Sequence, residues 1–132
     1  VMVVPAAWLV GAMIGLRALG IPPLPAFGIV SLVVLGLLVA LDVKLPDWGI
    51  ATLGGMFGLL HGLLNGVALN AAPERGLNLL GIVTTVFVFV LLVSATAASQ
   101  RSGWTRVAVR VAGSWVVAVG MLMFGWLFRG TV

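Results

Sequence analysis

The only histidine of the chain, His61, lies in the middle of an apolar segment that reads "GGMFGLLHGLLNG". Asn65 follows one helical turn later, and four residues turn a helix by about 400°, so the two side chains point about 40° apart. A polar side chain in the middle of an apolar helix is costly in lipid and usually faces the interior of a helix bundle. Two interpretations stay open: a neutral imidazole that joins helices through a hydrogen bond, or a ligand or transport site.

Hydroxyl groups on other apolar segments could join His61 and Asn65 in one site. Consecutive spans run in opposite directions, and by this count Ser31, Thr84 and Thr85 stand at a depth comparable to that of Asn65. Together with His61, they form the predicted pathway for a metal ion or another substrate. One imidazole with neutral oxygens binds a divalent ion weakly, because nickel and its neighbours favour several nitrogen or carboxylate donors. No carboxylate lies inside a span, so we expect no tightly bound cofactor.

Catalytic chemistry has little support in these residues. The chain has no cysteine, which excludes disulfides and thiolate metal sites. A haem held by two histidines is impossible with one, and the residues around Ser114 ("AGSW") lack the turn that exposes a hydrolase nucleophile. We therefore expect that the protein is not an enzyme.

Glycine recurs at every fourth residue through the histidine segment, and a shorter series occurs in the first apolar run. Helices in lipid associate through close packing, which small residues permit. We interpret both series as helix-packing positions that need no ligand. They are Gly54, Gly58, Gly62 and Gly66 in the first case, and Gly11 and Gly15 in the second.

The composition predicts an integral membrane protein. The 132 residues are 62% hydrophobic and 8% charged, with a mean hydropathy of +1.28, whereas a soluble domain carries about 25% charged residues. The net charge of +4 comes from residues near helix ends, so we expect contact with lipid headgroups and no nucleic acid. We predict an all-α bundle of five spanning helices in a single domain, residues 1–132. The expected spans are 1–19, 26–41, 49–69, 79–98 and 107–128.

Basic residues near the ends of the runs predict the orientation. Four fall on the side of the N-terminus and three on the other, which favours a cytoplasmic N-terminus. They are Lys44, Arg101, Arg106 and Arg110 against Arg17, Arg75 and Arg129. Val1 already lies inside an apolar segment, and we expect the true N-terminus to lie upstream of it.

The five tryptophans divide into two groups by their place in the runs. Trp48, Trp104 and Trp126 lie near helix ends, where aromatic rings anchor a helix at the membrane interface. Trp8 and Trp115 lie deeper, and we expect them to be packing residues.

The stretch "FGLLHGLLNG" resembles the HupE/UreJ family of small bacterial membrane proteins. The similarity covers nearly the whole chain. "GIPPLPAFGIVSLVVLGLLVAL" looks like the family's proline-containing turn and its serine-bearing helix, and "RVAVRVAGSWVVAVGMLMFGW" is similar to its closing helix. The family's histidine helix carries His-Gly, then a second His and Gly, then an acidic residue. His61, Gly62 and Gly66 match it, whereas Asn65 replaces the second histidine and no acid follows. The family's other signature, His-Pro followed by Asp-His, would fall upstream of Val1.

The resemblance implies a function in metal transport across the bacterial inner membrane. The family is associated with hydrogenase and urease gene clusters and is regarded as a family of nickel permeases. The expected function is therefore transport of a divalent transition metal, nickel first and cobalt next, with Ni²⁺ as cargo. The alternative is a non-transporting structural or assembly subunit of a larger membrane complex. The expected partners are the lipid bilayer and either a membrane protein complex or further copies of the chain.

Overall fold

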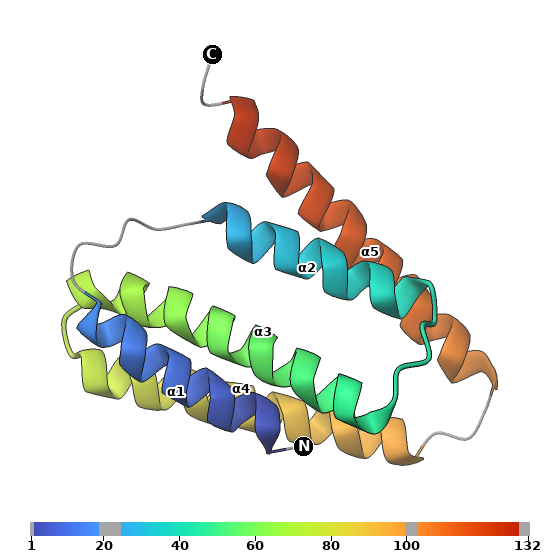
Figure 1. Cartoon of the computed structure of the whole chain (residues 1–132), viewed down its shortest axis with the longest axis horizontal. Coiled ribbons are helices and arrows are strands. Elements are labelled where there is room, and N and C mark those ends of the chain that lie inside the picture. Colours follow the sequence, from blue (N-terminus) through green and yellow to red (C-terminus); the bar gives the residue numbers. More distant parts are fainter. Residues whose placement is uncertain (1, 19–24, 100–102, 130–132) are drawn as a thin grey trace. The chain divides into compact units, whose positions relative to one another are not determined.

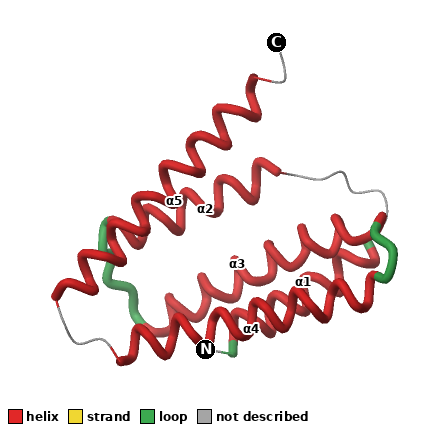
Figure 2. The backbone as a smooth tube through the Cα atoms, turned by 180° about the vertical axis from the view of Figure 1, so that it is seen from behind, coloured by secondary structure: helices red, strands yellow, loops and turns green. Residues whose placement is uncertain are grey.

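The computed structural model describes residues 2–18, 25–99 and 103–129, and for 96–99 it describes the backbone only. Within these ranges the chain is helical and has no strand (Figures 1 and 2). The elements are α1 (Val3–Arg17), α2 (Pro25–Ala40), α3 (Asp47–Ala68), the 3-10 helix η1 (Leu69–Ala71), α4 (Arg75–Ser99) and α5 (Gly103–Arg129). The predicted all-α class is confirmed. Arg101, which the orientation count used, lies outside the described residues.

Three of the helices are long and apolar enough to cross a membrane. They are α3 together with η1, α4 over Arg75–Ala95, and α5. α1 and α2 have 15 and 16 residues, or about 22–24 Å, which is shorter than the ~30 Å of a hydrocarbon core. The membrane class is therefore supported, and the count of five spans stays a prediction.

α4 and α5 begin four residues before the starts expected from hydropathy, at Arg75 and Gly103. The first turns of both helices are polar, so a search for apolar runs misses them. A helix that crosses a membrane can continue into the interface, because its backbone hydrogen bonds are satisfied internally at any depth.

The helices form two compact units. α1, α3, η1 and α4 make unit 1, and α2 and α5 make unit 2. The expectation of a single domain over 1–132 stays a prediction, and each unit is described by itself.

In unit 1, α1 and α3 pack in parallel with their backbones in direct contact (Figure 1). A Cβ atom built on Gly58 would stand 2.7 Å from the carbonyl oxygen of Val4, and one built on Gly62 would overlap the carbonyl oxygen of Trp8. Gly66 continues the series against Ala12. The partner's number rises with the glycine's number, so the two helices run in the same direction.

The contact is reciprocal, because the glycines of α1 meet the backbone of α3 in the same way. A Cβ atom on Gly11 would lie 2.9 Å from the backbone nitrogen of Leu63, and one on Gly15 would lie 2.9 Å from the Cα atom of Gly66. Gly54 has more room, since its nearest neighbour is a methyl group of Val4 at 3.0 Å. Five of the six glycines therefore allow backbone-to-backbone packing that any side chain would prevent.

The turn after α3 is hydrogen-bonded to the C-terminal end of α1. The side-chain amide of Asn70 in η1 donates hydrogen bonds to the carbonyl oxygens of Gly15 (3.1 Å) and Ala18 (3.3 Å). These carbonyls belong to the last turn of α1, where backbone acceptors have no partner within the helix. The end of α1 is therefore held by Asn70, more than 50 positions away in the sequence. α4 also packs on α1 and η1.

In unit 2, α2 and α5 pack antiparallel around a second set of glycines (Figure 2). A Cβ atom on Gly36 would lie 2.9 Å from the carbonyl oxygen of Gly113, and one on Gly113 would lie 3.0 Å from the carbonyl oxygen of Gly36. Gly120 faces Val33, one turn earlier on α2. This pair of helices therefore has the same kind of close contact as α1 and α3, although its glycines form no regular series in the sequence.

Burial tests the two tryptophans that were expected to pack, and it agrees for Trp8 only. Trp48, Trp104 and Trp126 are exposed, and Trp8 is buried against α3. Trp115, however, is 72% exposed, so the expectation that it packs inside the protein was wrong. Its position near the middle of α5 indicated depth in the membrane, but depth does not tell which face of a helix meets lipid.

Candidate functional site

His61 lies in the second half of α3, beside the contact with α1. Gly62 faces α1 directly, and adjacent residues of a helix point about 100° apart, so the imidazole flanks this contact. The ring is half-buried. A polar side chain at this depth therefore lies at the edge of the packed pair.

Asn65 uses its side-chain amide within α3. Its Nδ2 atom donates to the carbonyl oxygen of His61, 2.8 Å away, so its side chain lies back along the helix toward the imidazole. Asn65 is half-buried as well. The two polar residues are thus neighbours on one side of α3.

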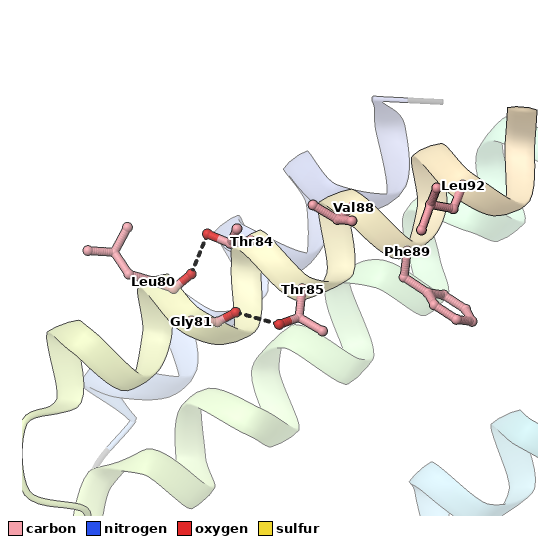
Figure 3. A pocket seen from close by; sticks show the side chains of 7 residues that line it. All are labelled: Leu80, Gly81, Thr84, Thr85, Val88, Phe89 and Leu92. Carbon is pink, nitrogen blue, oxygen red and sulfur yellow. Dashed lines mark hydrogen bonds between the residues drawn. The ribbon is translucent and has the colours of Figure 1, made fainter.

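Thr84 and Thr85 lie on the outer face of α4 (Figure 3). Both side chains are exposed, and their hydroxyls donate to the carbonyl oxygens of Leu80 and Gly81 at 2.8 Å. They line a shallow hollow of about 540 Å³ whose other walls are apolar, formed by Leu80, Gly81, Val88, Phe89 and Leu92. His61 is not among the residues that line this hollow.

Ser31 is a buried polar residue of unit 2. It is 4% exposed, and its hydroxyl donates to the carbonyl oxygen of Gly28 at 2.7 Å. Ser31 belongs to α2 and so to a different unit from His61. Its place in a common pathway stays a prediction.

Few metal-binding side chains lie together in the described part of the chain. Among the described residues, no three His, Cys, Asp or Glu side chains come together to hold a metal ion. An imidazole and an amide oxygen are acceptable ligands for a transition metal, but a site with so few ligands binds the metal weakly. Ions move through a membrane protein when each site binds well enough to admit the ion and weakly enough to release it.

An ionic contact at the end of α2 was not anticipated from the sequence. Asp42 follows α2 with a left-handed backbone (φ 52°), a conformation that aspartate tolerates better than most residues. Its carboxylate accepts a hydrogen bond from Arg106 in the first turns of α5. This bond lowers the pKa of Asp42 below the ordinary value, and the charges of Arg106, Arg110 and Lys44 add to the effect. The signal available in the sequence was an acid directly after an apolar run, in a loop that also carries Lys44.

Acid is expected to weaken the contact between α2 and α5. Because the folded-state pKa of Asp42 lies below the ordinary value of an aspartate, the ion pair contributes fully at any pH above that ordinary value. Its contribution is lost as the pH falls through the folded-state pKa. In detergent, the midpoint of thermal unfolding should therefore decrease more steeply on acidification in the wild type than in Asp42→Asn. Identical pH profiles for the two proteins would show that the pair contributes nothing.

These features define the class of the protein: an all-helical integral membrane protein whose helices pack through glycine and whose longest apolar helices can cross a bilayer. The sequence model of the HupE/UreJ protein family matches residues 1–123. The chain belongs to the HupE/UreJ family.

One curated relative supports this assignment. The chain is 27% identical over 124 residues to "Protein HupE" of Rhizobium leguminosarum bv. viciae, a match that covers 91% of the chain and 65% of the relative. The chain therefore spans about two thirds of the length of this relative. No solved structure matches the chain.

Proposed function

We propose that this chain forms the transmembrane part of a permease for a divalent transition metal, nickel first and cobalt next. The observation that carries the proposal is His61, the one imidazole of a HupE/UreJ chain, placed with Asn65 in the middle of an apolar helix. The cost of placing a polar group there favours a functional role. The metal is the cargo, held by few ligands and released on the other side.

The proposal includes five spans, with α1 and α2 crossing beside longer helices. The helix directions support it. In a chain that crosses at every helix, the first and third helices run in the same direction and the second and fifth in opposite directions. α1 and α3 are parallel, and α2 and α5 are antiparallel, as this path requires. The close contact of α1 along α3 also gives the short helix a partner for its full length.

Single cysteines should report this path, because these 132 residues contain none. We expect a cysteine at Ala71, in the turn after α3, to react with a membrane-impermeant maleimide added to intact cells. A cysteine at Val43, in the turn after α2, should react only after the membrane is opened. This pattern corresponds to an inner-membrane protein with its N-terminal side in the cytoplasm. Labelling of both positions from the same side of the membrane would contradict the five-span path.

The direct test of transport is nickel accumulation in cells. Cells that lack their own nickel uptake should accumulate radioactive Ni²⁺ when they express the full-length protein, and unlabelled Co²⁺ in excess should compete. An empty vector is the control. If expression leaves nickel accumulation at the vector level while the protein is present in the membrane, the permease proposal is wrong. That result would favour a structural or assembly subunit of a larger complex.

A further inference from the structure

A basic cluster stands where α2 meets the first turns of α5. It consists of Lys44, Arg106 and Arg110 around the single carboxylate of Asp42. Arg106 is paired with Asp42, and all three basic residues influence the pKa of that carboxyl, so they lie within electrostatic reach of it. One acid against three bases leaves an excess of two positive charges at this end of unit 2.

Arg110 is only partly used by the protein. Its Nε atom donates to the carbonyl oxygen of Ala40 at 3.0 Å, at the C-terminal end of α2. The side chain is exposed, and its two terminal nitrogens have no hydrogen-bond partner within the described part of the chain. A guanidinium with its terminal nitrogens available matches the geometry of a phosphate group, which it can bind through two parallel hydrogen bonds.

An apolar groove lies beside this guanidinium. It has a volume of about 310 Å³ and is lined by Ala40, Val107, Arg110, Val111 and Ser114. The hydroxyl of Ser114 donates to the carbonyl oxygen of Val111 at 2.7 Å, so it is used by its own helix. The groove therefore presents methyl groups along its length and a cation at one place.

The sequence of α5 places Arg110 at the boundary of the hydrocarbon. No charged residue occurs between Arg110 and Arg129, and this segment rises about 28 Å as a helix, close to the ~30 Å of a hydrocarbon core. Trp104, which is 84% exposed, precedes Arg110 by less than two turns, as suits a ring at the interface. Arg110 thus reaches the level of the lipid phosphates, while Val111 and Ser114 lie on the hydrocarbon side.

We propose that this groove is a binding site for one anionic phospholipid. The phosphate lies on the terminal nitrogens of Arg110, and an acyl chain lies along Val111 and Ser114. The excess of positive charge selects an anionic headgroup over a zwitterionic one. The apolar walls of the groove and its depth in the membrane favour a lipid over free phosphate, because free phosphate makes no apolar contacts. Because the same lipid touches α5 and the end of α2, it fastens the two helices of unit 2 together. The site is independent of metal transport.

Native mass spectrometry of the full-length protein in detergent tests the site. Phosphatidylglycerol and phosphatidylcholine with the same acyl chains are added at equal concentration. We expect one phosphatidylglycerol to stay bound, with a preference over phosphatidylcholine of about fivefold or more. Fivefold corresponds to the ~1 kcal/mol that one basic residue contributes near an anionic surface. Equal retention of the two lipids would overturn the proposal.

Two variants and one competitor locate the site. Arg110→Gln should lose the preference, whereas Arg129→Gln, which removes a basic residue at the other end of α5, should keep it. Ser114→Phe fills the groove without changing any charge and should lower the retention of phosphatidylglycerol about fivefold or more. It keeps the test valid if Arg110→Gln fails to fold. Unchanged retention of phosphatidylglycerol in Ser114→Phe would show that the groove does not hold a lipid. Displacement of phosphatidylglycerol by millimolar inorganic phosphate, to the same extent in Ser114→Phe and the wild type, would show the same.

Discussion

Replacing Gly62 with leucine is expected to separate α1 from α3 and to prevent stable folding of unit 1. A Cβ atom at this position already overlaps the backbone of Trp8, and it would stand 3.0 Å from the backbone nitrogen of Ala12. Backbone atoms cannot move aside as the end of a flexible side chain can, so the helices must move apart. Overpacking a core costs about 1–3 kcal/mol and sometimes more, and a leucine between two backbones belongs at the upper end of that range.

The matched control is Gly81→Leu on α4. Nothing lies within 4 Å of a Cβ atom built at Gly81. Leucine is also a better helix former than glycine by up to about 1 kcal/mol, so this variant should purify with unchanged or slightly higher thermal stability. Thermal unfolding and yield in detergent compare the two variants. If Gly62→Leu unfolds at the same temperature as Gly81→Leu, α1 and α3 do not pack through their glycines.

The hydropathy of the sequence was sufficient to predict the helices, because in lipid each helix satisfies its own backbone. It was less informative about their ends and their faces. The polar first turn of α5 looks like a loop, yet its Arg106 pairs with Asp42. Trp115 looks buried by its depth, but it lies on an exposed face. Depth in a membrane follows from position along a helix, whereas the face that is covered depends on neighbours that a single sequence does not show.

The contacts between distant residues were the hardest to anticipate. The glycine spacing indicated that α3 packs closely against something, but not that α1 is its parallel partner. Gly36 and Gly113 lie far apart in sequence and outside any regular series, so nothing marked them as one contact. Asn70 seemed an ordinary turn residue, although it closes the end of α1. Of the candidate site, the arrangement of His61 and Asn65 on one side of a helix follows from helical geometry alone. Their relation to Ser31 requires knowledge of how the two units meet.

Replacing His61 with alanine is expected to abolish nickel uptake and to leave the amount of protein in the membrane unchanged. The ring flanks the packed face of α3 and is only half-buried, so its loss removes the proposed ligand without opening the glycine contact. The opposite role, a histidine that joins helices by a hydrogen bond, predicts lower stability with uptake in proportion to protein. His61→Gln separates the two roles, because glutamine keeps hydrogen-bonding groups and lacks the imidazole nitrogen that binds nickel. Thr52→Ala is the control on the same helix, since the Thr52 hydroxyl bonds only to the carbonyl oxygen of Trp48 at 2.8 Å.

The deciding measurement is the rate of radioactive nickel uptake per molecule of full-length protein in the membrane, made on one preparation of cells for each variant. The metal-pathway account predicts uptake at the vector level for His61→Ala and His61→Gln, with Thr52→Ala equal to the wild type and all four proteins present in equal amount. Uptake per molecule in His61→Gln equal to that of the wild type would contradict it.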